Sequence, residues 1–229
     1  MILFKKILSW IFYGIAISLF AFVLSMELNP QFMPQPAFIV VMSIFICGAT
    51  IAGTLLRING LIDTVKKKKT IRITICLLFI YYVSYLIYIL FLDSAFGRGG
   101  YSLFSGYMDY RTHLKYATNF IPFKEISAYL TNMFRGSFRY SVVNIFGNLI
   151  AFSPMGFFLP VLFKKLRKFI PFIIVTVGII AAVEALQFLL LVGRCDIDDL
   201  MLNSIGAIIA YFIFRLKFFQ NMFYKLEIL

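Results

Sequence analysis

The chain has 229 residues, of which 62% are hydrophobic and only 14% are charged. A soluble domain carries roughly a quarter charged residues, so this composition excludes a protein whose surface lies mainly in water. The formal net charge of +12 would suggest nucleic-acid binding in a soluble protein. Because no basic, aromatic-interleaved module is present, we expect no nucleic-acid partner, and contact of Lys and Arg with anionic lipid headgroups accounts for the charge.

Long apolar runs dominate the sequence. A membrane-spanning helix needs about 20 mostly apolar residues, and six runs qualify. They are residues 7–24, 37–56, 71–92, 142–163, 169–192 and 200–219. Because open strands and irregular backbone are not tolerated against hydrocarbon, the sequence predicts an all-α, polytopic membrane helix bundle with about six transmembrane helices. The first run is interpreted as a retained helix, since no small-residue cleavage signature follows it.

The distribution of basic residues predicts the orientation of these helices. Most of the 22 Lys and Arg residues lie at the N-terminus, between the second and third runs, between the fourth and fifth, and around the end of the sixth. Cytoplasmic segments carry this excess, so both termini are predicted to be cytoplasmic in a multi-pass cell membrane protein. Segment 93–141 is then external. It is too long for a simple turn, and residues 122–134 are expected to form a surface-lying or re-entrant piece.

The fourth predicted helix run is interrupted by a proline. Pro154 removes a backbone donor inside residues 142–163, so a kink is expected there that leaves the carbonyl near Ile150 without its helical partner. A kink beside polar residues can open a cavity between helices. An ordinary packing kink explains the proline equally well.

The segment before the sixth run is rich in charged residues. It supplies Arg194, Asp196, Asp198 and Asp199. If a helix begins near Asp196, four residues follow one another at spacings of three, four and three, which puts them on one face. These are Asp196, Asp199, Asn203 and Gly206. Carboxylates at a helix start also cap its free amides, so a capping role and a functional role both remain open.

Polar residues inside the neighbouring runs fall at the same depth. Glu184 and Gln187 lie one turn apart in run 169–192, and an ionisable group at that depth is costly and rarely faces lipid. The predicted topology puts both in the external half of the membrane, together with Asn148 and Asn203. We therefore predict an outward-facing polar pocket. The alternative is that these side chains only join neighbouring helices by hydrogen bonds.

Three polar motifs follow one another in a fixed order. They read Asn148-x-x-x-Phe152-x-Pro154-x-Gly156, Glu184-x-x-Gln187, and Arg194-x-Asp196-x-Asp198-Asp199-x-x-x-Asn203-x-x-Gly206. This set resembles the VanZ-like family, named for a teicoplanin-resistance protein. The stretch from Asn119 to Phe123, with Arg98 upstream, is similar to the loop that precedes the family's motif-bearing helices.

The resemblance covers about residues 71–210. It implies a four-helix membrane core at residues 71–219, preceded by two accessory helices in residues 1–70 and followed by a cytoplasmic tail at 220–229. It also implies a link to glycopeptide antibiotics of the teicoplanin type, which act on cell-wall precursors outside the membrane.

A binding or remodelling function fits this arrangement best. The pocket would hold a membrane lipid or a lipid-linked cell-wall precursor, with Arg194 pairing with phosphate. The expected ligand-binding residues are Arg98, Asn148, Gln187, Arg194, Asp198 and Asn203.

The alternative is a membrane-embedded enzyme, a hydrolase or transferase acting on such precursors. Its catalytic residues would be Glu184, Asp196 and Asp199, with Glu184 as a general base whose pKa is raised by burial. Asp196, Asp198 and Asp199 would then bind a divalent cation, and carboxylates without His favour Mg²⁺ or Ca²⁺ over zinc. Transport fits less well, because the polar groups stop in the outer half of the membrane.

Overall fold

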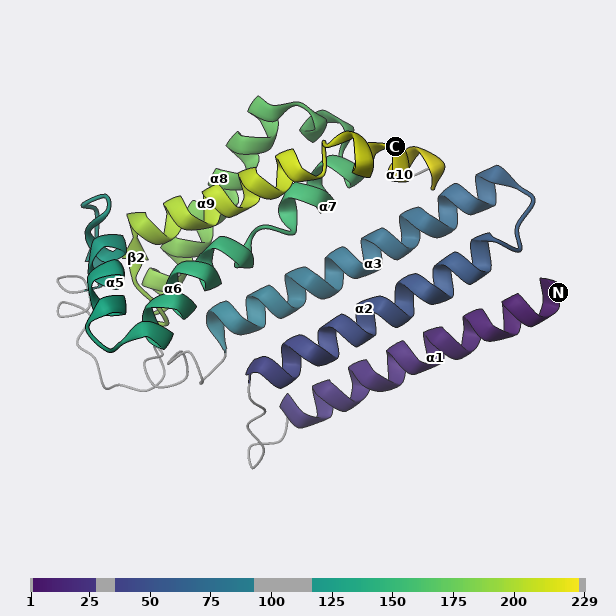
Figure 1. Cartoon of the computed structure of the whole chain (residues 1–229), viewed down its shortest axis with the longest axis horizontal. Coiled ribbons are helices and arrows are strands. Elements are labelled where there is room, and N and C mark those ends of the chain that lie inside the picture. The colour runs from purple at the N-terminus through teal and green to yellow at the C-terminus, as the bar shows by residue number, and fades with distance from the viewer. Residues whose placement is uncertain (1, 28–35, 93–116, 227–229) are drawn as a thin grey trace. The chain divides into compact units, whose positions relative to one another are not determined.

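The computed structural model describes residues 2–27, 36–92 and 117–226, which are helical over most of their length (Figure 1). The described chain is all-α, as predicted, apart from one pair of two-residue strands. Residue contacts divide it into two compact units, Met1–Tyr82 and Val83–Glu227. The domain division predicted after residue 70 stays a prediction.

The first unit is built from three long apolar helices. These are α1 (Ile2–Glu27), α2 (Pro36–Ile58) and most of α3 (Thr64–Phe91). Small polar groups join them: Ser9 Oγ donates to the Gly53 carbonyl at 2.8 Å, and the hydroxyls of Thr54 and Thr74 share a hydrogen bond at 2.9 Å. Small residues and hydroxyls are the usual means of joining helices in lipid, where apolar side chains gain nothing by leaving the hydrocarbon.

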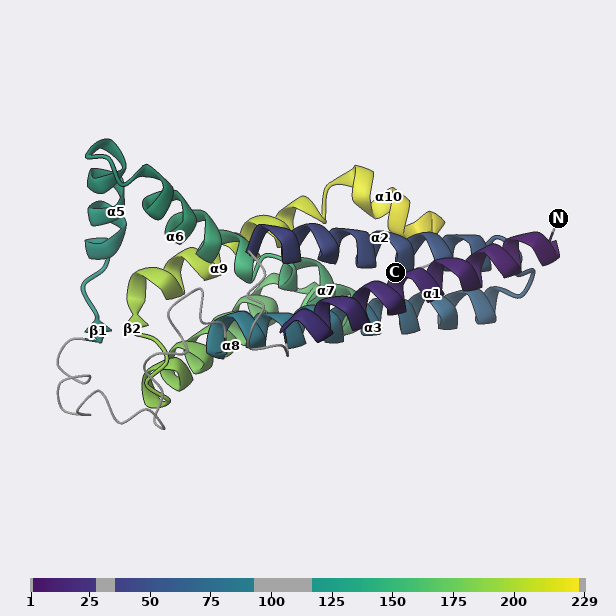
Figure 2. The same ribbon diagram turned by 90° about the horizontal axis from the view of Figure 1, so that it is seen from below.

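The second unit contains shorter helices and both strands. In chain order they are β1 (Thr118–Asn119), α5 (Lys124–Phe134), α6 (Phe138–Ala151), α7 (Met155–Leu162), the 3₁₀ helix η2 (Lys164–Arg167), α8 (Phe169–Leu189), β2 (Cys195–Asp196), α9 (Ile197–Ile213) and α10 (Lys217–Lys225). Helix α5 occupies the stretch for which a surface-lying piece was predicted. Within this unit, β1, β2 and α5 lie at one end of α8 and α9, and η2 and α10 lie at the other end (Figures 1 and 2).

Five described helical segments are long and apolar enough to cross a membrane: α1, α2, α3, α8, and α6 with α7 taken as one span of 25 residues. Helix α9 becomes the sixth if it is counted together with α10, to which it is joined by a bend of 66°. The prediction of about six spans is thereby confirmed, but the sixth run is not straight to residue 219. Arg215 and Leu216 form i→i−3 bonds that end α9, and the charged residues beyond start a separate helix.

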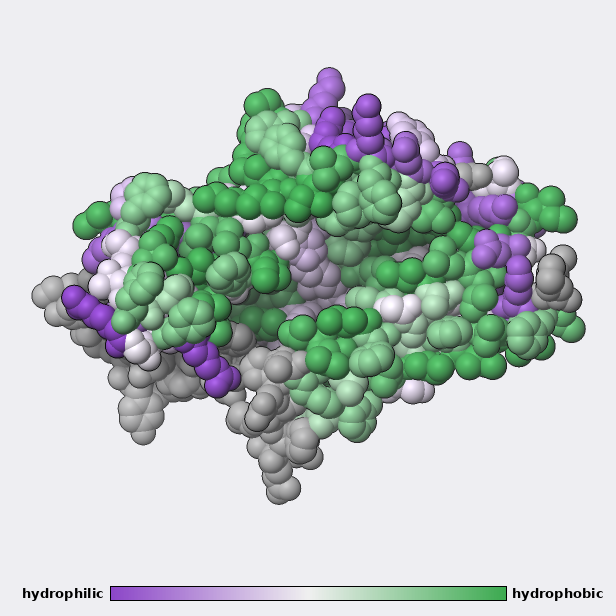
Figure 3. All heavy atoms as spheres, in the orientation of Figure 1, coloured by the Kyte–Doolittle hydropathy of each residue, from purple (hydrophilic) through white to green (hydrophobic). Residues whose placement is uncertain are grey.

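Large apolar side chains cover the outside of the helices. Exposed examples in the spans include Ile44, Ile73, Ile80, Phe146, Ile174 and Ile209. Figure 3 shows this hydrophobic covering, with hydrophilic residues gathered over η2 and α10. In water such a surface would be strongly unfavourable, so the solvent of these helices is lipid.

Two glycines set how closely α9 approaches its neighbours. A Cβ on Gly206 would lie 1.8 Å from the carbonyl oxygen of Leu149 in α6, and one on Gly156 would lie 2.5 Å from the backbone nitrogen of Tyr211. Neither position has room for a larger residue. The close crossing of α9 over α6 and α7 therefore depends on glycine.

The break predicted at Pro154 separates α6 from α7. The carbonyl of Ile150, which was expected to lose its partner, accepts hydrogen bonds from both the Ser153 amide at 3.1 Å and the Ser153 hydroxyl at 2.8 Å. Pro154 itself lies just before the first residue of α7, where its missing N–H costs little. The expected orphan carbonyl is thus satisfied by the serine that precedes the proline.

We expect Gly206→Ala to lower the stability of the bundle by about 1–3 kcal/mol or more, because the added methyl group collides with fixed backbone. Thermal unfolding of the protein in detergent measures this. The matched control is Gly147→Ala in α6, where a Cβ meets nothing within 4 Å and better helix propensity should make the change neutral or slightly stabilising. An unchanged melting temperature for Gly206→Ala would contradict the crossing.

Candidate functional site

Two loops far apart in the sequence are joined by strand pairing. β1 and β2 pair in parallel, with Thr118 opposite Cys195 and Asn119 opposite Asp196. The Cys195 amide also donates to the Ala117 carbonyl at 2.9 Å. This pairing brings the segment before α5 next to the segment before α9, where Asp196 and Asp198 bond residues of the first segment and the start of α5.

Asp196 caps α9. Its Oδ1 accepts the backbone amide of Asp198 at 2.9 Å and the side-chain amide of Asn119 at 2.9 Å. The carboxylate is buried, at a helix N-terminus where the free amides and the helix dipole both stabilise negative charge. The capping interpretation of the sequence is therefore the one that fits Asp196.

Asp198 caps a different helix. It belongs to α9, yet its Oδ1 accepts the amide of Phe123 at 2.5 Å, and its Oδ2 accepts the amides of Glu125 at 2.8 Å and Ile126 at 3.2 Å. Phe123, which precedes α5, has a left-handed backbone (φ 66°), and no side chain of that segment caps the helix. Asp198, with an exposed fraction of 0%, supplies the missing cap from about 75 residues away.

Asp199 faces α6. The side-chain amide of Asn148 donates a short hydrogen bond to its Oδ1, in the same pair of helices that cross at Gly206 and Leu149. Asn144, one turn earlier in α6, donates instead to the Tyr140 carbonyl of its own helix at 2.8 Å. Of these two asparagines, Asn148 is the one that reaches the acidic segment.

Helix α8 contributes two buried polar residues to this end of the unit. Glu184 and Gln187 are only 6% and 3% exposed, so neither faces lipid. Gln187 Nε2 donates to the Leu90 carbonyl at 2.9 Å. Burial of Cys195 is the main cause that raises the pKa of its thiol, and the negative charges of Glu184 and Asp196 raise it further. Glu184 is thus within electrostatic reach of the loop that leads into α9.

One residue of α9 keeps an unused acceptor. Asn203 is 3% exposed, and none of the described residues donates to its Oδ1. A buried amide oxygen without a donor is costly, so a partner from outside the described chain would stabilise it.

We call Asn148, Glu184, Gln187, Asp199 and Asn203 the polar cluster. Arg194, Glu125 and Tyr129 lie at its rim. Arg194 Nη1 lies 3.9 Å from Glu125 Oε1, and the Arg194 side chain is 55% exposed. Burial, followed by nearby negative charges of which Asp199 contributes most, raises the pKa of Tyr129 above its usual range. The Tyr129 hydroxyl therefore stays protonated and able to donate. The sequence interpretation missed Glu125 and Tyr129, although their i, i+4 spacing in a predicted surface helix puts them on one face.

The three aspartates do not come together around a common point. Asp196 and Asp198 point their oxygens at the amides of two helix starts, and Asp199 points at Asn148. Among residues 2–27, 36–92 and 117–226, no group of three His, Cys, Asp or Glu side chains is arranged to hold a metal ion. The structure thus does not assemble the predicted Mg²⁺ or Ca²⁺ site. Arg98 lies outside the described residues.

Comparison with known proteins agrees with the motifs in these helices. A family model described as VanZ/LLP1 matches residues 79–219, more than half of the chain. No curated protein and no solved structure matches the chain. The matched residues include all of the polar cluster just described.

We expect Asp198→Ala to free the start of α5. Loss of the carboxylate leaves three backbone amides without their acceptor, which should cost about 2 kcal/mol or more. Hydrogen exchange followed by mass spectrometry should show faster exchange at residues 123–126. The control is Asp63→Ala, which removes the cap that accepts the Val65 and Lys66 amides at the start of α3. Unchanged exchange at residues 123–126 in Asp198→Ala would refute the capping role.

The Cys195 thiol offers a test of the position of Glu184. In a Cys47→Ser, Cys76→Ser background, the rate of maleimide labelling should keep rising beyond pH 9, because only the thiolate reacts and its pKa is raised. Glu184→Gln removes one of the charges that raise this pKa, so labelling at a fixed alkaline pH should become faster. Glu27→Gln, the same change in α1, should leave the rate unchanged. Equal rates in the two variants would mean that Glu184 is remote from Cys195.

Proposed function

The chain belongs to the VanZ/LLP1 family, and from this premise we propose that its polar end binds the headgroup of a lipid-linked envelope molecule. Binding or remodelling of that molecule outside the membrane would reduce susceptibility to teicoplanin-type glycopeptides. The observation that carries the proposal is the set of polar residues that α6, α8 and α9 contribute to one end of this unit, beside an exposed guanidinium. Glu184, Gln187 and Asn203 are buried, Asn148 and Asp199 are partly buried and hydrogen-bonded to each other, and the guanidinium is that of Arg194.

The chemistry of these groups favours a phosphorylated, hydroxyl-bearing headgroup. Arg194 is half-exposed, and its contact with Glu125 is at 3.9 Å, a distance at which an exposed ion pair contributes little. A guanidinium in this setting can turn to phosphate and hold it through two hydrogen bonds. The Asn203 Oδ1 would accept from a hydroxyl or amide group of the same ligand. Sugar and peptide parts of envelope precursors carry such donors.

Position supports an outward-facing site. The polar cluster lies at the opposite end of α8 and α9 from η2 and α10 (Figure 1), and these carry Lys164, Lys165, Arg167, Lys217 and Lys225. Basic segments favour the cytoplasmic side, so the acidic end would face outward. A molecule that is assembled on lipid and displayed outside would meet this end first.

Binding is a better explanation than metal-dependent catalysis. Asp196 Oδ1 and both oxygens of Asp198 hold helix starts, so the three aspartates do not face one common point among the described residues. A hydrolase or transferase that uses Glu184 as a general base without metal is the alternative. It would consume lipid precursor at a rate unaffected by chelator, whereas a binding protein leaves the precursor intact.

We expect Asn148→Ala to abolish most of the protection that the wild-type chain gives against teicoplanin in a Gram-positive host. The change removes the amide that holds Asp199, so the carboxylate loses its orientation toward the ligand. The inhibitory concentration of teicoplanin measures the effect. Asp199→Asn and Glu184→Gln should act in the same direction, since each removes a charge while keeping the shape of the side chain.

Asn144→Ala is the matched control, because Asn144 has the same chemistry in the same helix but bonds only its own backbone. It should retain protection at equal membrane levels. Full protection from Asn148→Ala, Asp199→Asn and Glu184→Gln together would end the proposal. An impermeant maleimide applied to intact cells must also label Cys195, and labelling only after lysis would refute the outward orientation.

A further inference from the structure

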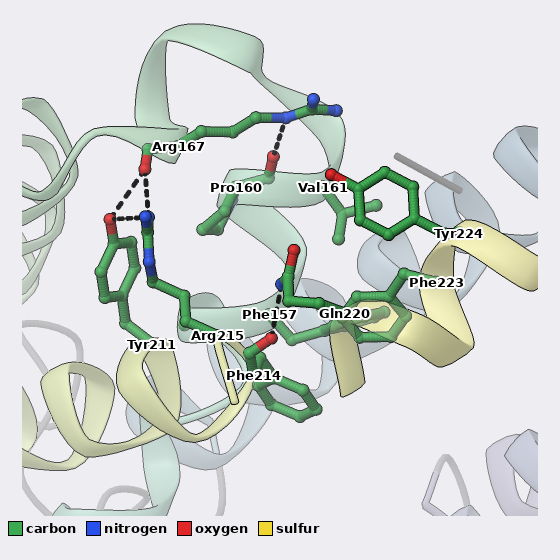
Figure 4. Close-up of a pocket in the computed structure, with 11 residues that line it drawn as sticks. Phe157, Pro160, Val161, Arg167, Tyr211, Phe214, Arg215, Gln220, Phe223 and Tyr224 are labelled. Carbon is green, nitrogen blue, oxygen red and sulfur yellow. Dashed lines mark hydrogen bonds between the residues drawn. The ribbon is translucent and has the colours of Figure 1, made fainter. Parts of the chain in front are cut away.

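A second site lies at the basic end of the second unit. A half-open pocket of about 330 Å³ is lined by residues of α7, η2, α9, α10 and the α9–α10 bend (Figure 4). Its walls include the aromatic rings of Phe157, Phe214 and Phe223, which pack on one another with centroids 5.0–6.3 Å apart. Arg167 and Arg215 also line it. The pocket thus combines an apolar wall with two cationic groups.

Both arginines are held in place by backbone carbonyls rather than by acids. Arg167 Nε donates to the Pro160 carbonyl at 3.2 Å, while Arg215 Nη1 donates to the Arg167 carbonyl and the Tyr211 hydroxyl, both at 2.6 Å. The two Nη groups of Arg167 donate to none of the described residues. Figure 4 shows this end of Arg167 above Tyr224, on the side of the pocket opposite Gln220.

No described carboxylate balances these charges. The pocket lining contains no Asp or Glu, and neither arginine takes part in an ion pair with any residue of the described ranges. A guanidinium without a carboxylate partner attracts anions. An anion with two or more oxygens could accept from the Nη donors of Arg167 in bidentate fashion.

We propose that this pocket binds the phosphate of an anionic membrane lipid, with Arg167 on the phosphate and the aromatic wall against the start of the acyl chains. The bend of 66° between α9 and α10 puts the pocket where the span ends, which is the depth of lipid headgroups. Phe223 is the one buried residue of α10, so α10 closes the apolar side. This site is separate from the polar cluster, and its failure would leave the function proposed for that cluster untouched.

The lysines of η2 provide the internal comparison. Lys164 and Lys165 are exposed and do not line the pocket. They would attract any anionic surface over a distance limited by salt screening. Arg167, two residues further, is half-buried and fixed, so it should recognise a bound phosphate specifically. Arg167→Gln and Lys165→Gln therefore remove the same charge from the same short helix with different expected results.

The experiment uses the full chain purified in neutral detergent and a fluorescent short-chain phosphatidylglycerol, with anisotropy as the readout. Arg167→Gln should weaken binding about tenfold, as expected for the loss of charge-assisted hydrogen bonds. Lys165→Gln should change it by less than about twofold, as is usual for an exposed charge. If Arg167→Gln is not monodisperse, Arg167→Lys keeps the charge but loses the planar fork, and it should still bind severalfold more weakly than wild type.

Two competitors identify the source of the phosphate. Phosphatidylcholine with the same chains should compete poorly, because its choline charge offsets the phosphate, and inorganic phosphate should compete only at far higher concentration, because it lacks the apolar part. Equal losses in Arg167→Gln and Lys165→Gln would overturn the site in favour of diffuse attraction. Competition by inorganic phosphate as strong as that by the lipid would overturn the lipid assignment and point to a soluble phosphate ligand.

Discussion

The polar end of the second unit depends on one buried carboxylate. Asp198 has no exposed surface and accepts three backbone amides at the start of α5. A buried charge is tolerated only when such bonds replace water, and α5 has no capping side chain of its own. The buried carboxylate of Asp198 and the start of α5 therefore stabilise each other. The charge is stabilised by the free amides, and the helix that forms the rim is held to α9 because of the charge.

The neighbouring contacts follow from this attachment and from two glycines. Strand pairing between Asn119 and Asp196 brings the two loops together, and Gly206 lets α6 approach α9 until Asn148 reaches Asp199. A larger residue at Gly206 would push α6 away and separate the polar pair as well. Gly206 and Asp199 belong to the same motif. The close packing that the glycine allows is what places Asp199 beside Asn148.

The sequence was sufficient for the spans, for a separate element where α5 lies and for the burial of Glu184, because apolar run length and the cost of charge in lipid are local properties. The hydrogen-bond partners of the aspartates could not all be predicted from the sequence. Spacing shows that Asp196 can cap its own helix, but not that Asp198 caps a helix about 75 residues earlier, because that depends on strand pairing of two residues. The bend after α9 was also missed, since apolar residues continue through Phe218 and Phe219 while α9 ends at Ile213.

The distribution of satisfied and unsatisfied groups indicates where ligands can act on this protein. Asp198 uses both carboxylate oxygens and Asp196 uses Oδ1 to accept amides at the starts of α5 and α9, so these two acids stabilise the scaffold even though they lie in the most polar motif. Among the described residues, acceptor capacity remains with the Asn203 oxygen in the second turn of α9, and donor capacity remains with the Nη groups of Arg167 near its other end. Asn203 precedes the end of α9 at Ile213 by 10 residues, which is about 15 Å of helix, so these two sets are separated by roughly half of a bilayer core. Acids at the N-terminus of α9 and Arg215 beyond its C-terminus also interact favourably with the helix dipole. The same separation of charge that stabilises the helix therefore makes its two ends chemically distinct.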